Sequence, residues 1–141
     1  MPSMEITKYT RDNLVEKLRA HEINPTHQRI EIAFALFSRH EHLSADQVMA
    51  IVNERHSETS KATVYNTLNL FLGKKLIREV IVDPSKVFYD PNPNPHHHFY
   101  NVDTGALTDI DARDVRVTGL PRLPRGMVTE GVDIIVRIRS R

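Results

Sequence analysis

Three consecutive histidines, His96–His98, are the residues whose type and spacing point most directly to chemistry. The segment reads as a β-strand, in which alternate side chains share a face, so His96 and His98 point one way and His97 the other. Across a predicted turn, Asp109 comes about opposite His98 on the next strand. Imidazoles bind metal ions and are good axial ligands for haem iron. The alternative is a solvent-exposed strand that binds no ligand.

The 141-residue chain has no cysteine, which restricts the side chains that could bind a metal or haem together with those histidines. Disulfides, cysteine-type zinc sites, iron–sulfur clusters and thiol redox sensing are excluded, so any metal or haem must be held by His, Asp, Glu or Tyr. The chain is 40% apolar and 26% charged, as is typical of a globular protein. No apolar run approaches the roughly 20 residues of a membrane span, and no secretory signal is present. We expect a cytoplasmic protein without a membrane partner.

A second chemical signal begins at Ser60, where the spacing of apolar residues predicts a helix ending before Gly73. Its first turns carry hydroxyls, an amide, a tyrosine and a lysine, with no acid. A helix N-terminus favours phosphate, and an asparagine can make a bidentate pair with adenine. The alternative is a packing tyrosine beside solvated polar residues. The candidate DNA contacts on this helix are Ser60, Lys61, Thr63, Tyr65 and Asn66.

The elements before and after this helix give the order of a winged helix. Three earlier helices are predicted over residues 10–21, from Thr26 onward and from the capping box at 44–47 to about His56. Strands at 77–82 and 86–89 then form a hairpin. In a winged helix the last helix before the hairpin enters the major groove. The fold class is therefore α+β, with a DNA-binding domain over residues 1–90.

A Pro/Asn-rich hinge at 91–95 separates this domain from residues 96–141, which are predicted to be mostly strand. Strands are expected at 96–102, 106–110 and 132–138, with a possible short one at 115–117 and an irregular loop at 119–126. A unit of about 46 residues is near the size limit for independent folding, and no disulfide can help it. Its strand edges also need covering. We expect a homodimerisation and ligand-sensing domain.

Five segments, in this order and spacing, resemble the ferric uptake regulator family of bacterial metal-responsive repressors over nearly the whole chain. Within that family the sequence is most similar to the iron response regulators of rhizobia and related alphaproteobacteria. The triple histidine followed by residues 99–105, and Tyr65-Asn66, carry the narrower similarity. The resemblance implies a dimeric winged-helix regulator, not an enzyme, that binds a pseudo-palindromic operator and responds to haem. The five segments are Thr26–Arg29, His42–Asp46, Ala62–Tyr65, Lys86–Phe88 and His96–His98.

The resemblance also implies site residues. Arg29 joins the DNA contacts. His42 and His98 match two ligands of the family's metal site and Asp109 matches an acidic third ligand. The fourth position falls on Tyr89, where relatives have a carboxylate. Such a set suits Zn²⁺, Mn²⁺ or Fe²⁺.

Departures from the family pattern favour a changed ligand or operator. Asn66 replaces the usual arginine, so the operator is expected to differ. The family's second metal site is largely missing, with Pro95 and Arg116 at two of its positions and only His97 retained. This loss favours haem, which we assign to His96, His97 and His98.

Three functions follow in order of preference. The first is a haem- and iron-responsive repressor whose DNA affinity falls when haem binds at 96–98. The alternative is a repressor that depends on Fe²⁺, Mn²⁺ or Zn²⁺. The remote alternative is a haem carrier or small metalloenzyme, although the sequence has no Ser/His/Asp arrangement, glycine-rich phosphate loop or His-Glu-x-x-His helix.

Overall fold

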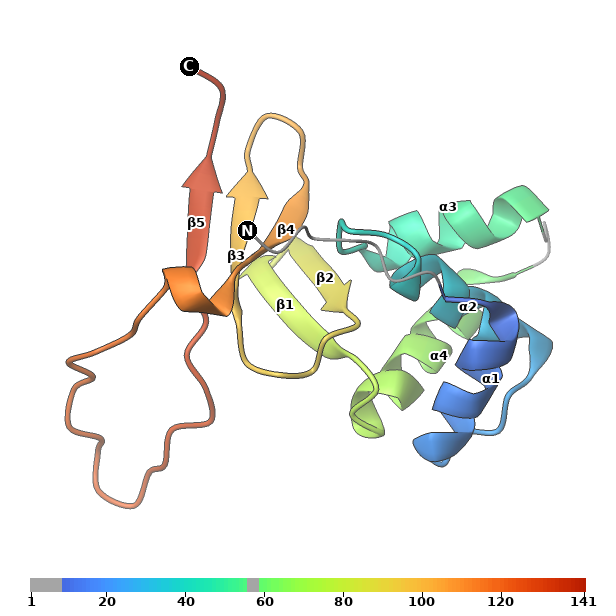
Figure 1. Ribbon diagram of the computed structural model, residues 1–141, viewed down its shortest axis with the longest axis horizontal. Coiled ribbons are helices and arrows are strands. Elements are labelled where there is room, and N and C mark those ends of the chain that lie inside the picture. Colours follow the sequence, from blue (N-terminus) through green and yellow to red (C-terminus); the bar gives the residue numbers. More distant parts are fainter. Residues whose placement is uncertain (1–8, 56–58) are drawn as a thin grey trace. The chain divides into compact units, whose positions relative to one another are not determined.

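The computed structural model describes residues 9–55 and 59–141 and divides the chain into two compact units (Figure 1). The N-terminal unit is Met1–Pro93 and the C-terminal unit is Asn94–Arg141. The division falls inside the predicted hinge at 91–95. None of the described helices is long and apolar enough to cross a membrane.

The described residues of the N-terminal unit, 9–55 and 59–93, form four helices followed by an antiparallel hairpin, as the winged-helix prediction requires. Hydroxyl side chains start the helices: Thr10, Thr26 and Ser60 each accept a hydrogen bond from a backbone N–H in the first turn. The capping box before the third helix is confirmed, since Ser44 and Gln47 bond each other's backbone N–H. The elements are α1 (Arg11–Ala20), α2 (His27–Phe37), α3 (Ala45–Arg55), α4 (Lys61–Gly73), β1 (Arg78–Asp83) and β2 (Lys86–Asp90).

One apolar cluster holds the four helices together. Every helix contributes side chains to it, including Leu14, Ile32 and Val48. On α4, Leu68 and Phe71 are completely buried. This packing fixes which face of α4 turns outward, and so which residues can meet a partner. The end predicted at His56 for the third helix lies outside the described residues.

We expect Ser60→Ala to destabilise the protein by about 1 kcal/mol, because it removes the side-chain cap of α4. The Ser60 hydroxyl accepts from the Thr63 backbone N–H at 3.1 Å. Urea unfolding followed by circular dichroism measures the change. Ser60→Asp is the control: it keeps an oxygen acceptor at the same place and should retain stability. Equal losses in the two variants would mean that capping is not what Ser60 contributes.

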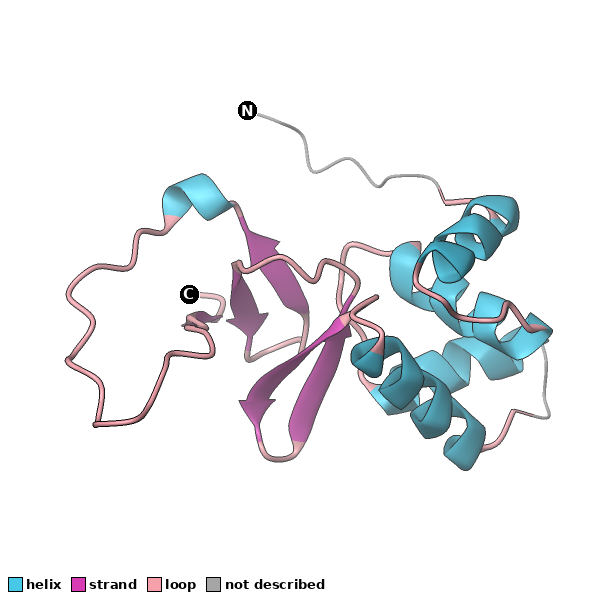
Figure 2. Ribbon diagram, turned by 90° about the horizontal axis from the view of Figure 1, so that it is seen from below, coloured by secondary structure: helices cyan, strands magenta, loops and turns pink. Residues whose placement is uncertain are grey.

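The C-terminal unit contains a three-stranded sheet in the order β4-β3-β5 (Figure 1). The strands are β3 (His97–Asn101), β4 (Leu107–Ile110) and β5 (Ile135–Ile138), with β3–β4 antiparallel and β3–β5 parallel. The predicted hairpin is confirmed, and Gly105 in its turn has a φ of 77°, which suits glycine. The strand suggested at 115–117 was wrong. A one-turn helix, Ala112–Asp114, leads instead into a long exposed loop that ends at β5 (Figure 2).

Candidate metal centre and DNA-reading helix

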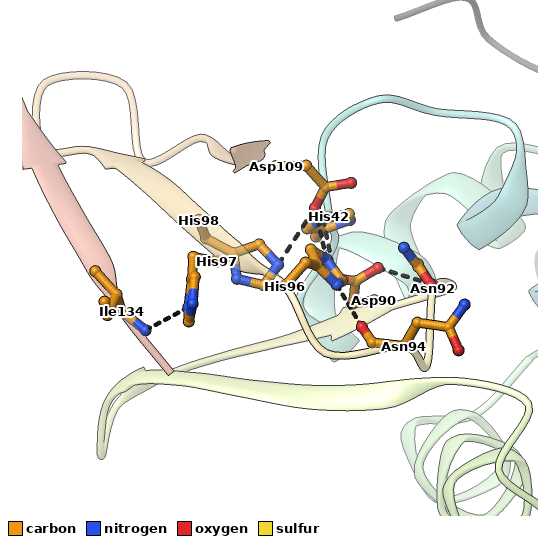
Figure 3. A network of polar contacts seen from close by, with 9 residues as sticks. All are labelled: His42, Asp90, Asn92, Asn94, His96, His97, His98, Asp109 and Ile134. Carbon is orange, nitrogen blue, oxygen red and sulfur yellow. Dashed lines mark hydrogen bonds and ion pairs between the residues drawn. The ribbon is translucent and has the colours of Figure 1, made fainter. Parts of the chain in front are cut away.

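Three side chains of the C-terminal unit converge on one point. The strand register pairs His98 with Asp109, as predicted. Nε2 of His96 lies 2.8 Å from Oδ1 of Asp109, and Nε2 of His98 lies 3.3 Å from the same oxygen (Figure 3). Both histidines are buried, and His98 is inaccessible to solvent. His96 directly precedes β3 and continues its alternation, so it lies on the same side as His98 and completes the triad.

The hydrogen bond at Nδ1 of His96 determines what Nε2, the ring nitrogen that faces Asp109, can offer to a ligand. Nδ1 of His96 lies 2.6 Å from the carbonyl oxygen of Asn94. A carbonyl only accepts, so Nδ1 donates its proton to it, and when the ring is neutral the lone pair lies on Nε2. A lone pair aimed at a carboxylate oxygen requires a proton or a cation between them. A backbone carbonyl that orients a ligating imidazole in this way is a common feature of metal sites.

His97 points away from the triad and has a different role. The backbone N–H of Ile134 donates to Nδ1 of His97 at 3.0 Å (Figure 3). Nδ1 is therefore unprotonated, and the neutral ring carries its proton on Nε2. In this state His97 offers neither nitrogen to a metal or to haem iron. Its hydrogen bond instead ties the start of β5 to β3.

The N-terminal unit holds a second buried imidazole–carboxylate pair. Nε2 of His42 lies 3.2 Å from Oδ2 of Asp90, and both side chains are almost completely buried (Figure 3). The other carboxylate oxygen of Asp90 accepts from the Asn92 backbone N–H at 2.8 Å. His42 immediately precedes the bridge between Leu43 and Tyr89, which anchors the end of β2.

Tyr89 does not face His42, although it was expected to be a ligand. Neighbouring residues of a strand point to opposite faces, and Asp90 takes the face toward His42. Tyr89 instead lines a cavity of about 410 Å³ with Tyr65. Burial, then the nearby Glu79 carboxylate and Tyr65, raises the pKa of the Tyr89 phenol, so the phenolate form that metals bind is disfavoured. Asp90 therefore replaces Tyr89 as the candidate oxygen ligand of β2.

The donor set of the C-terminal triad fits a first-row divalent metal. Two imidazole nitrogens and one carboxylate oxygen suit Zn²⁺, Mn²⁺ or Fe²⁺. Ligand atoms about 2.1 Å from a tetrahedral ion lie about 3.4 Å apart, close to the separation of His98 and Asp109. We expected His96 to bind haem, whereas its position beside His98 and Asp109 makes it a candidate metal ligand. The predicted strand alternation, which puts His96 and His98 on one side, already indicated this pairing.

The first turns of α4 expose the predicted DNA contacts. Ser60, Lys61, Tyr65 and Asn66 are exposed and Thr63 is half-buried, while Val64 faces the core. The ammonium of Lys61 lies 5.9 Å from the centre of the Tyr65 ring and 4.0 Å from a carboxylate oxygen of Asp46. Neither contact holds Lys61 tightly, since its side chain is 65% exposed. The helix thus presents a cation, hydroxyls and an amide around its N-terminus.

Arg29 comes from a different element, the first turn of α2. One guanidinium nitrogen donates to the carbonyl oxygen of Asn24 at 2.9 Å. This contact stabilises the chain that enters α2 and leaves the other guanidinium hydrogens for a phosphate. Arg29 is thus contributed by α2, whereas the other predicted contacts come from the start of α4.

Comparisons with known proteins find a matching family and related repressors. A family model described as the ferric uptake regulator family matches residues 20–134. The chain is 26% identical over 107 residues to the peroxide-responsive repressor PerR of Staphylococcus epidermidis, covering 76% of this chain and 71% of that protein. It is 27% identical over 107 residues to PerR of Staphylococcus aureus, covering 76% and 72%.

Two solved structures show the same fold. A zinc-bound manganese uptake regulator aligns with a TM-score of 0.70 at 18% identity, covering 91% of this chain and 98% of that one. The ferric uptake regulator of Pseudomonas aeruginosa, solved with manganese, aligns with a TM-score of 0.62 at 23% identity, covering 89% and 96%.

Proposed function

The chain belongs to the ferric uptake regulator family, and we propose that it is a repressor whose binding to operator DNA depends on a divalent metal. Members of this family are dimeric DNA-binding transcription regulators rather than enzymes. The observation that carries the proposal is the convergence of His96, His98 and Asp109, two buried imidazoles and a carboxylate. A regulator of genes acts in the cytoplasm, which is part of the proposal.

Fe²⁺, Mn²⁺ and Zn²⁺ are the proposed ions, because mixed nitrogen and oxygen ligands accept all three. The similar manganese uptake regulator is bound to zinc, and the similar ferric uptake regulator was solved with manganese. The resemblance also predicts that His42 serves the same ion as His98 and Asp109. We keep this as a proposal, with Asp90 in place of Tyr89 because Asp90 is the β2 side chain that contacts His42. His42→Ala, assayed for metal affinity, tests it separately.

In the proposed repressor, one set of residues holds the metal and another set contacts DNA. The bound cation supplies the positive charge that the clustered lone pairs and the carboxylate favour. His96 and His98 supply nitrogen donors, and the Asn94 carbonyl holds the His96 ring in orientation. The core that buries one face of α4 leaves Lys61, Tyr65 and Asn66 on the outer face, where a major groove can reach them.

A haem-responsive repressor is the second candidate function, suggested by the narrower resemblance to the iron response regulators. Its support is the histidine run itself, which could give iron an axial imidazole. The structure favours a divalent metal ion over haem as the ligand of these histidines. His98 is inaccessible to solvent, and His97 could ligate iron only after losing its hydrogen bond with Ile134. The relatives found are peroxide-, manganese- and iron-related regulators.

Selection of DNA sequences from a random duplex library tests the proposal. We expect enrichment of a pseudo-palindromic sequence when Mn²⁺ is present and none when a chelator removes the metal. Enrichment of the same sequence with chelator would contradict metal dependence. Enrichment of nothing under any ligand condition would contradict DNA binding itself.

Lys61→Ala is expected to make the salt dependence of operator binding shallower by roughly one unit of log K against log[salt], because one phosphate contact is lost. Fluorescence anisotropy at several salt concentrations measures the slope. Arg19→Ala is the matched control: it removes the same charge from an exposed position on α1. Identical slopes in the Lys61 variant and the unaltered protein would show that Lys61 does not reach the DNA backbone.

A further inference from the structure

A cavity of about 330 Å³ opens among α1, α2 and α3 within the N-terminal unit. None of its lining residues is a predicted DNA contact, and none belongs to α4 or to the hairpin. Its apolar lining comes from α2 and α3: Phe34, Ala35, Ile51 and Val52. Such a surface suits the apolar body of a small molecule.

The charged groups around the cavity leave an excess of positive charge. The charge of Arg11 is balanced by Glu31, since its Nε and Nη2 donate to the two carboxylate oxygens of Glu31 at 2.7 and 3.1 Å. Its guanidinium also stacks on the Phe34 ring, 4.3 Å from the centroid. The remaining charged lining residues are Arg39, Glu54 and Arg55, all exposed. Two guanidinium groups against one carboxylate favour an anion.

A buried hydroxyl gives an independent sign of a ligand. Oγ of Ser38 is inaccessible to solvent and has no hydrogen-bond partner among the described residues, although Ser38 lines the cavity. Buried polar groups are nearly always hydrogen-bonded, and one left without a partner costs free energy. Because Oγ is closed to solvent, it could donate to a carboxylate in the cavity once the Ser38 side chain rotates toward the cavity.

We propose that this cavity binds a small organic anion with an apolar body, such as an aromatic carboxylate. The apolar body packs against Phe34 and Ile51, and the carboxylate meets Arg39 and Arg55, with the Ser38 hydroxyl as a further donor. Guanidinium groups pair with carboxylates in a planar, bidentate manner, which gives the site its preference for this class. The inference does not depend on the metal centre or on DNA binding.

The experiment uses the full chain, with 2-naphthoate as probe and its neutral analogue 2-naphthalenemethanol as control ligand. Titration calorimetry measures affinity, and backbone amide shifts locate the bound probe. We expect saturable binding of 2-naphthoate with the largest shifts at residues 34–55, and binding of the alcohol at least about tenfold weaker. Equal affinity for the two ligands, shifts centred elsewhere or no binding would overturn the proposal.

Charge-matched variants distinguish binding in this cavity from nonspecific electrostatic attraction of the anion to the protein. The double variant Arg39→Gln/Arg55→Gln should weaken 2-naphthoate binding at least about tenfold while its circular dichroism spectrum stays unchanged. The control Arg122→Gln/Arg125→Gln removes the same charge from the exposed loop of the C-terminal unit. Equal weakening in both pairs would contradict a built site. Neither metal nor DNA is present in these titrations. Absence of 2-naphthoate binding would therefore leave the proposed regulator function intact, and binding of 2-naphthoate does not depend on that function.

Discussion

Replacing His98 with alanine is expected to lower the affinity for Zn²⁺ and Mn²⁺ by about 100-fold or more. Even partners that only orient a metal ligand cost 10–100-fold when removed, so losing a direct ligand should cost at least that. His98 is the completely buried histidine of the triad, and its Nε2 lies 3.3 Å from Oδ1 of Asp109. Competition with a chromophoric chelator measures the affinity.

Two matched variants make this result specific. Asp109→Asn keeps the shape of the side chain but removes the charge, and it should also weaken metal binding strongly. His97→Ala removes a neighbouring histidine of the same strand that contacts Ile134 rather than the triad. It should leave metal affinity within about threefold of the unaltered protein. If His97→Ala is as damaging as His98→Ala, the assignment of ligands on β3 is wrong.

Phe71→Ala is expected to destabilise the protein by about 3–5 kcal/mol. The Phe71 ring is completely buried in the cluster shared by the four helices, so alanine removes its packing and leaves a cavity. Domains are stable by only about 5–15 kcal/mol, so this loss should lower the unfolding midpoint sharply. Thermal and urea unfolding of the metal-free protein measure it.

The control for this prediction lies on the same helix. Tyr65→Ala also truncates an aromatic residue of α4, but Tyr65 is 38% exposed. It should cost less than half as much stability, although it removes a predicted DNA contact. Equal destabilisation by the two substitutions would contradict the orientation of α4 on which the DNA interface rests.

Local signals in the sequence were enough to predict the N-terminal unit. Ser44 and Gln47 form a capping box whose spacing alone identifies a helix start, and Ser60 caps α4 by the same physics. The period-two alternation of β3 correctly separated His97 from its two neighbours. The hairpin turn set the register that pairs His98 with Asp109.

Features that depend on tertiary contacts could not be predicted in this way. Whether Tyr89 or Asp90 faces His42 depends on the phase of β2, and that phase is fixed by the bridge to Leu43 from a distant segment. The role of His97 depends on Ile134, 37 residues away, so no local pattern indicates it. The loop after Asp114 begins with the alternation Val115-Arg116-Val117, which predicted a strand, but none of the described strands pairs with it and the loop stays irregular.

The most direct test of the central claim is the affinity of the protein for its selected operator, measured by fluorescence anisotropy with chelator, with Mn²⁺ and with haemin. The metal-dependent account predicts tight binding only with Mn²⁺, no binding with chelator, and loss of the Mn²⁺ response in His98→Ala. Tight binding with chelator that haemin then abolishes would contradict it and would establish the haem-responsive reading instead.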